Sequence, residues 1–276
     1  MARVQAGIEE PAVAVFYARQ VPGIVQRTNT LVQIGVLLRK RGEESSAREV
    51  LAEALELARQ LNGKNRSRAL AMLIPHLPPN QRQNVLGEAL SLVHELDNYY
   101  DKARALISLL PYRPTSQRER LVQHVSDLIE GLGNPYRRSR ALAALIPYLP
   151  TDQQPSAVED AIETAAKIPD AARSLYTRAV LIQHLPLDRR RSAVAEVLRA
   201  IQDLEEDPGN NRHIHYAQRY SLHALAAVAP FLSPDLLEEA IITARRLRRA
   251  HRRAYVLAEL ARHLPLDRSC RLLSTC

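Results

Sequence analysis

The stretch ALIPYLP at residues 144–150 places two prolines three positions apart behind a run of small apolar residues. Because proline lacks a backbone N–H and clashes with the preceding helical turn, the first proline predicts the end of a helix. Similar stretches recur, and each begins 36 residues after the last: LIPHLP at 73–78, LLPYRP at 109–114, LIPYLP at 145–150 and LIQHLP at 181–186. A fixed period of this length is typical of repeat architectures.

A second helix is predicted to begin directly after each copy. Two positions beyond the last proline of each copy stand short polar residues that favour helix N-caps. These are Asn80, Ser116, Asp152 and Asp188. Gln83 and Glu119 would complete a capping box in two of the copies.

An apolar stripe follows each predicted helix start, with the spacing i, i+3, i+4, i+7, i+10 of one helix face. The four stripes start at Leu86, Val122, Val158 and Val194. The segment before each proline pair, such as ARALISLL at 103–110, is shorter and nearly apolar all round, which predicts a more buried helix. Each repeat is therefore predicted to be a hairpin of a short buried helix and a longer amphipathic one.

Looser versions of this pattern lie on both sides, which gives about six and a half hairpins. The predicted fold is all-α: a right-handed α-solenoid of antiparallel helix hairpins with a repeat of about 36 residues. Residues 1–276 are predicted to form a single domain of this kind. The array begins and ends partway through a repeat, so a piece of a longer protein or of a larger assembly, and a chain capped by its own terminal helices, are both open interpretations.

The composition narrows the class of protein further. The two cysteines, Cys270 and Cys276, lie at the C-terminus, so a disulfide framework is not expected and a reducing, cytoplasmic location is predicted. No apolar window is long enough for a membrane helix and no signal peptide is visible, so no membrane partner is expected. The net charge of +8 has two equally favoured interpretations. Either the chain binds an anionic partner, or the charge serves only to keep the surface soluble.

The first full unit, LVQIGVLLRKRGEESSAREVLAEALELA at 31–58, resembles a tetratricopeptide repeat (TPR). The matching residues are Leu31, Ile34, Gly35, Leu38, Ala47, Leu51 and Ala54, while the late proline of the family would fall at Arg59. The later units look like divergent relatives with a Pro-x-x-Pro turn, similar to arrays beside signalling domains in large bacterial proteins. The resemblance implies protein or peptide binding on a concave helical surface, and no catalysis.

Two groups of arginines are candidate partner-binding residues. Arg68, Arg104 and Arg140, here called the arginine row, stand 36 residues apart at the starts of successive short helices. In one interpretation the row binds an acidic peptide or phosphates through the N–H groups of its planar guanidinium ions. In the other, each arginine pairs with an acidic residue at the end of the preceding helix, such as Glu95, Asp97 or Glu130. The second group is a dense basic segment that forms either a binding patch or a solvated face: Arg245, Arg246, Arg248, Arg249, Arg252 and Arg253.

Other unusual residues have structural explanations that compete with functional ones. Ring side chains occupy the turn between the prolines, and packing against the neighbouring repeat is the favoured explanation for them: His76, Tyr112, Tyr148, His184, Phe231 and His263. About 11 extra residues fall around 205–218, where His213 and His215 are only weak evidence for a metal site.

No catalytic motif is present: the chain lacks a Gly-rich phosphate loop, GxSxG, HExxH and CxxC. The sequence thus predicts a protein that is not an enzyme, with no catalytic residues, cofactor or metal. The leading hypothesis is a scaffold or sensor module that binds a protein or peptide segment, acidic in character, on its concave surface. The alternative is a nucleic-acid-binding α-solenoid that uses the arginines, and self-association through the solenoid ends is also open.

Overall fold

The computed structural model describes residues 11–206, 214–246 and 250–261. Within these ranges every element is an α-helix or a short 3-10 helix, and none is a β-strand. The prediction of an all-α fold is therefore confirmed. The described helices belong to two compact units, Met1–Gly131 and Leu132–Cys276, and each unit is treated by itself below.

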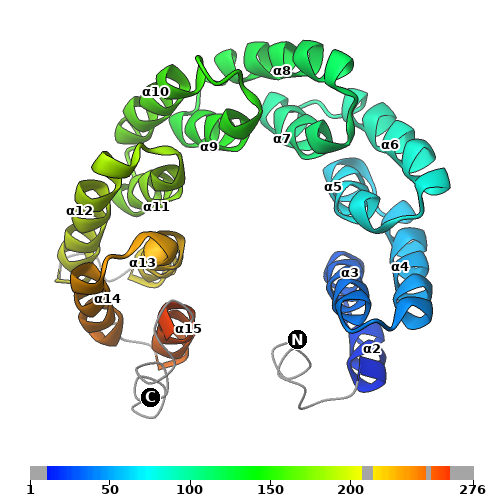
Figure 1. The fold of residues 1–276 in the computed structure, drawn as a ribbon, viewed down its shortest axis with the longest axis horizontal. Helices are drawn as coiled ribbons and strands as arrows, with labels where there is room; N and C mark the ends of the chain where they lie inside the picture. The colour runs from blue at the N-terminus through cyan, green and yellow to red at the C-terminus, as the bar shows by residue number, and fades with distance from the viewer. Residues whose placement is uncertain (1–10, 207–213, 247–249, 262–276) are drawn as a thin grey trace. The chain divides into compact units, whose positions relative to one another are not determined.

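Unit 1 is built from helices that pack against their neighbours in the chain. They are α2 (Pro11–Arg19), α3 (Ile24–Lys40), α4 (Glu44–Arg59), α5 (Gly63–Leu73), α6 (Pro79–His94), α7 (Tyr99–Leu109) and α8 (Thr115–Glu130). Helix α5 contacts both α3 and α7, so these three form one layer, here called the A layer of unit 1. Figure 1 shows α4, α6 and α8 side by side in a second layer, the B layer.

Unit 2 repeats this arrangement. Its helices are α9 (Pro135–Leu145), α10 (Gln154–Ala166), α11 (Ala171–Leu181), α12 (Leu187–Glu206), α13 (Ile214–Val228), α14 (Pro234–Arg246) and α15 (Ala250–Ala261). Helix α11 contacts α9 and α13, and α13 contacts α15, so these four form the A layer of unit 2. The B layer contains α10, α12 and α14, and α12 contacts α14 directly.

The proline segments form the turns between the layers. Five of the A helices, α5, α7, α9, α11 and α13, each continue into one turn of 3-10 helix. These turns are Ile74–His76, Leu110–Tyr112, Ile146–Tyr148, Ile182–His184 and Ala229–Phe231. A proline occupies the second position of four of these turns. The turn Ile182–His184 has Gln183 at that position and forms the same structure. The helix ends where the sequence predicted, although proline is not required for the turn.

The predicted N-caps of the B helices are wrong. Helices α6 and α8 take Pro78 and Pro114 as N-caps, and neither cap makes a side-chain hydrogen bond. Each proline has the extended ψ that an N-cap needs, 149° and 145°, and its carbonyl accepts the first intrahelical bonds. The helices therefore begin early enough to include Asn80 and Ser116 in their first turns. Helix α10 begins later, at Gln154, and α12 begins at Leu187, so Asp152 and Asp188 are not the caps either.

The N-caps that do bond lie on the A helices, 36 residues apart. The side chain of Asn98 accepts hydrogen bonds from the backbone N–H groups of Tyr100 and Asp101, at 2.9 and 3.2 Å. Asn134 and Asp170 cap α9 and α11 in the same way. Asn62, at the equivalent place before α5, makes no such bond.

A second recurring contact fastens each turn to the B helix that follows. The Nε atom of Arg82 donates to the Leu77 carbonyl oxygen at 2.7 Å, across the turn. The same bond, from a side chain to the carbonyl five residues earlier, is made by Arg118, Gln154 and Arg190. These side chains satisfy a carbonyl that the turn would otherwise leave without a partner.

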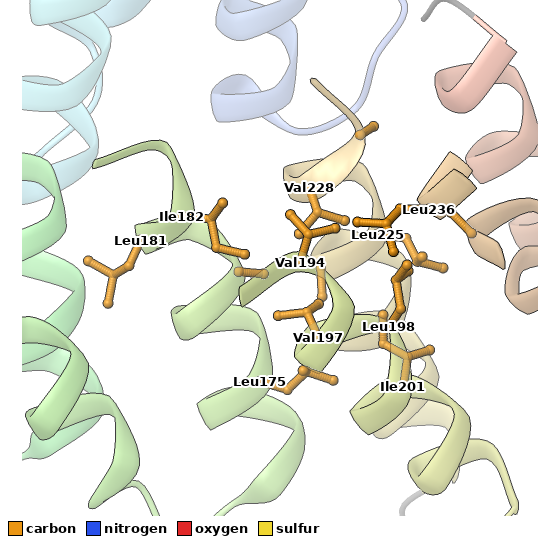
Figure 2. Close-up of a cluster of buried hydrophobic side chains, with 14 of the residues drawn as sticks. Leu175, Leu181, Ile182, Val194, Val197, Leu198, Ile201, Leu225, Val228 and Leu236 are labelled. Carbon is orange, nitrogen blue, oxygen red and sulfur yellow. The ribbon is translucent and has the colours of Figure 1, made fainter. Parts of the chain in front are cut away.

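The predicted apolar stripes are buried between the layers. Leu86, Val122, Val158 and Val194 all have less than a tenth of their surface exposed. Figure 2 shows this interior in unit 2, where Val194, Val197 and Ile201 of α12 join Leu175 of α11 and Leu225 of α13. The stripe prediction is confirmed, and the burial of these side chains supplies the main stabilising term of the fold.

Gly35, one of the residues that carry the TPR resemblance, lets α3 and α4 approach closely. A Cβ atom added at Gly35 would lie 2.6 Å from Cγ of Leu51. Both residues are buried, so the neighbouring side chain has little room to move.

The expected insertion changes the lengths of two helices. Helix α12 has 20 residues and α13 has 15, whereas α10 and α11 have 13 and 11. Extra residues therefore extend both helices. Residues 207–213, with His213, and the side chain of His215 lie outside the described part of the chain.

Candidate partner-binding surface

The arginine row lies on the A helices, as predicted. Arg68 on α5 and Arg104 on α7 are exposed, and neither forms a hydrogen bond or ion pair with any described residue. The expected pairing of these two with Glu95, Asp97 or Glu130 is therefore not formed in the described part of unit 1. Their guanidinium groups are available to a partner.

A groove of about 440 Å³ opens on the same layer of unit 1. It lies between α3, α5 and the 3-10 turns that end α5 and α7. Its lining is mostly apolar and consists of Val32, Gln33, Val36, Leu37, Lys40, Met72, Pro75, His76 and Tyr112. The exposed Lys40 is its only lysine or arginine, and within the described residues it makes no hydrogen bond or ion pair.

Arg68 lies on the same helix face as the groove. It precedes Met72 by four residues on α5, which places both side chains on one face. Arg104 lies on α7, the next helix of the same layer. The apolar groove thus has two cations on its own face, Lys40 and Arg68, that no described carboxylate neutralises.

His76 closes one wall of the groove as an uncharged ring. Its burial lowers the pKa of the imidazole, and the positive charges of Arg39 and Arg82 lower it further. Arg39 also donates a hydrogen bond to the His76 carbonyl oxygen at 3.1 Å. The backbone of this turn is therefore fixed to α3, and the ring, with its lowered pKa, is neutral at neutral pH.

A second groove in unit 1, of about 490 Å³, lies on the B layer between α4 and α6. Its charged groups already have partners: Arg59 bonds to Glu56 and Glu88, and Glu53 accepts two bonds from Arg19. Because these charges neutralise one another, the groove offers a partner little net attraction. The A-layer groove is the better candidate.

Arg140, the member of the arginine row that lies in unit 2, contacts a stack of rings. The guanidinium carbon of Arg140 lies 4.9 Å from the ring centroid of Tyr176. Tyr176 in turn packs against Tyr220 at 5.7 Å and His223 at 5.8 Å between ring centroids. The four side chains come from α9, α11 and α13 and are all half-buried on the A layer.

A second arginine–tyrosine pair joins the same two helices. The guanidinium carbon of Arg173 on α11 lies 5.4 Å from the ring centroid of Tyr136 on α9. Sequence reasoning missed both pairs, although the signal was present: Tyr176 occupies the next place in the row after Arg140, 36 residues on. We call Tyr136, Arg140, Arg173 and Tyr176 the stacked cluster.

The dense basic segment is described only in part. Arg245 and Arg246 are exposed at the end of α14, and Arg253 is half-buried on α15. The side chains of Arg248, Arg249 and Arg252 lie outside the described part of the chain.

The ring side chains of the turns take two different surroundings. In unit 1, His76 and Tyr112 line the A-layer groove. In unit 2 the rings are packing groups: Arg190 covers the Phe231 ring at 5.3 Å, and burial lowers the pKa of His184, whose ring also bonds to the Ala143 backbone. Tyr148 is half-buried, and His263 lies outside the described residues.

No group of three or more His, Cys, Asp or Glu side chains in the described part of the chain is placed to hold a metal ion. None of the described helices is both long enough and apolar enough to cross a membrane.

No protein-family model matches the chain, and no curated protein matches its sequence. What the structure defines is a class: an all-α protein of many helices packed against each other, compatible with a helical repeat protein.

Proposed function

We propose that the protein is a non-enzymatic interaction scaffold or sensor module that binds a segment of another protein on its A layer. In this proposal the chain is a TPR-like, right-handed α-solenoid whose A helices form the concave side. The repeated helix–turn–helix units, their 36-residue period and the close approach at Gly35 support it.

One observation carries the proposal: the apolar A-layer groove of unit 1 includes Lys40 and shares a helix face with Arg68, and neither cation has a described ionic partner. Apolar contacts give such an interface most of its affinity, while charges fix its partner and register. The expected partner segment therefore has an apolar anchor side chain followed by aspartates or glutamates.

The test is selection from a phage-displayed library of random dodecapeptides, followed by affinity measurement on the whole chain. Selected peptides should combine one large apolar residue with several acidic ones. Met72→Ala, which shortens a groove wall, should weaken their binding by about tenfold, or 1.4 kcal/mol. The matched control is Ile242→Ala, an exposed apolar residue on α14, which should leave the affinity unchanged.

Failure to enrich any peptide, or equal effects of the two substitutions, contradicts the proposal. An oligonucleotide that binds the chain with a steep salt dependence, through Arg68 and Arg104, would favour the nucleic-acid alternative.

A further inference from the structure

Arg140 is a half-buried cation without an anion. It forms no hydrogen bond or ion pair with any described residue, and its guanidinium lies over the face of the Tyr176 ring. A partly desolvated charge is costly unless an opposite charge or donor–acceptor contacts compensate for the lost water. An anion that contacted Arg140 would supply this compensation.

We propose that the stacked cluster of unit 2 is a carboxylate-binding site that receives acidic side chains of a partner protein segment. This inference rests on the proposed function, because it specifies the chemistry of the same class of partner. It concerns a different set of residues from the unit 1 groove, and the two are tested separately.

The geometry of the stack explains the choice of ligand. A guanidinium that lies over a ring uses its flat face for that contact and keeps its N–H edge for in-plane acceptors. A carboxylate accepts two parallel hydrogen bonds from this edge, and such bidentate pairs are among the strongest polar contacts in proteins. Tyr176 is itself held by Tyr220 and His223, so Arg140 is orientated before a ligand arrives.

A second arginine–tyrosine pair lies beside the first. Tyr136 and Arg140 are four residues apart on α9, and Arg173 and Tyr176 are three apart on α11. The positive charge of Arg173 therefore lies about one helical turn, roughly 5 Å along the helices, from the Arg140–Tyr176 pair. This charge adds to the attraction of the site for an acidic segment.

The arrangement favours carboxylates over single-stranded nucleic acid. Nucleic-acid binders of that kind offer aromatic faces on which bases stack. Here the Tyr136 and Tyr176 rings each already carry a guanidinium on one face. Binding of an oligonucleotide is therefore an outcome that would count against the inference.

The test uses a fluorescently labelled oligo-glutamate peptide and, in a parallel arm, an oligothymidylate of equal charge, titrated into the whole chain at fixed moderate salt. We expect the peptide to bind, and Arg140→Gln to weaken that binding by at least about tenfold, as loss of a charged hydrogen-bonded pair does. The control Arg199→Gln removes the same charge from an exposed position on α12 and should have little effect.

Two further variants separate orientation from charge. Tyr176→Leu removes the ring and should weaken peptide binding several-fold, whereas Tyr176→Phe retains the ring and should bind as the unsubstituted chain does. Circular dichroism verifies that each variant is folded, and Tyr176→Phe keeps the test decisive if Tyr176→Leu unfolds.

Equal losses from Arg140→Gln and Arg199→Gln would overturn the inference, since binding would then follow net charge alone. Tighter, Arg140-dependent binding of the oligothymidylate would overturn it as well. If oligo-glutamate ignores Arg140 while library peptides still depend on Met72, this inference fails and the proposed function stands. If library peptides do not depend on Met72 but oligo-glutamate depends on Arg140, the groove is wrong and the carboxylate site stands.

Discussion

At the scale of single residues, Gly35 shows how tightly the first hairpin is packed. The atom nearest to an added Cβ is Cγ of Leu51, which is a branch point rather than a flexible end, and Leu51 is only 2% exposed. Relief of the clash would require a shift of the side chain or of the helix. The close approach of α3 and α4 therefore depends on the absence of one carbon atom.

Substitution of Gly35 by alanine should lower the free energy of unfolding by about 1 to 2 kcal/mol, because overpacking outweighs the gain in helix propensity. The control is Gly87→Ala in α6, where an added Cβ meets nothing within 4 Å. That substitution should stabilise the chain by about 0.5 to 1 kcal/mol. Urea unfolding curves of the two variants, moving in opposite directions, check the prediction, and a gain for Gly35→Ala would refute it.

At the scale of secondary-structure elements, several helix starts are fixed by side chains that recur with the repeat. Asn98, Asn134 and Asp170 begin A helices, while Arg82, Arg118 and Arg190 bond back across the turns before B helices. In the repeat that has no arginine at this position, the side chain of Gln154 donates the equivalent hydrogen bond. Hydrogen bonding at this position therefore matters more than positive charge.

Replacement of Asn98 by alanine should cost about 1 kcal/mol of stability, because two backbone N–H groups at the start of α7 lose their acceptor. Asn62→Ala provides the comparison at the equivalent place, since Asn62 makes no side-chain cap bond. It should cost only a few tenths of a kcal/mol. Thermal unfolding of the two variants measures the difference, and equal losses would show that these bonds do not stabilise the helix.

At the scale of the whole molecule, contacts within each unit join a helix to the helices one or two places away from it in the chain. In unit 1, α5 contacts α3, α4, α6 and α7, and the corresponding pattern recurs for α11 in unit 2. An array of this kind derives its stability from each repeat and its two interfaces. Loss of one whole repeat should then leave the remaining interfaces usable.

Deletion of residues 63–98 tests this expectation within unit 1. It removes one 36-residue period and joins Asn62 to Tyr99, so that Asn62 takes the place of Asn98. We expect a folded chain with unchanged helix content per residue and a cooperative thermal transition. Deletion of residues 63–80, half a period, should abolish that cooperativity because the buried stripes no longer align. Similar behaviour of the two deletions would contradict the repeat organisation.

The sequence predicts the buried stripes and the turn positions well because both depend on local periodicity. Val158 is buried for the same reason that Val122 is: each starts a helical stripe at the same place in its repeat. Local periodicity does not assign the N-caps of the B helices. Pro78 and Asn80 lie within one turn of each other, and both residue types are common at helix starts. Which of the two residues becomes the N-cap depends on the backbone direction at the end of the 3-10 turn.

The candidate site was less predictable than the fold. The period identifies Arg68, Arg104 and Arg140 as one row, but it does not say which of them contacts a ring. That depends on the neighbouring helix: Tyr176 meets Arg140, whereas Arg68 and Arg104 have no such ring contact among the described residues. The A-layer groove likewise combines side chains from α3, α5 and two turns, which no single repeat contains.

The interior of each unit is only two helices thick, and this sets how stability scales with length. In a sphere-like protein the fraction of surface removed from water rises as the chain grows. In a two-layer stack each added hairpin brings a fixed share of interior and a fixed share of exterior. The heat-capacity change of unfolding per residue, which follows the apolar area exposed, should consequently be the same for short and long versions of such a stack.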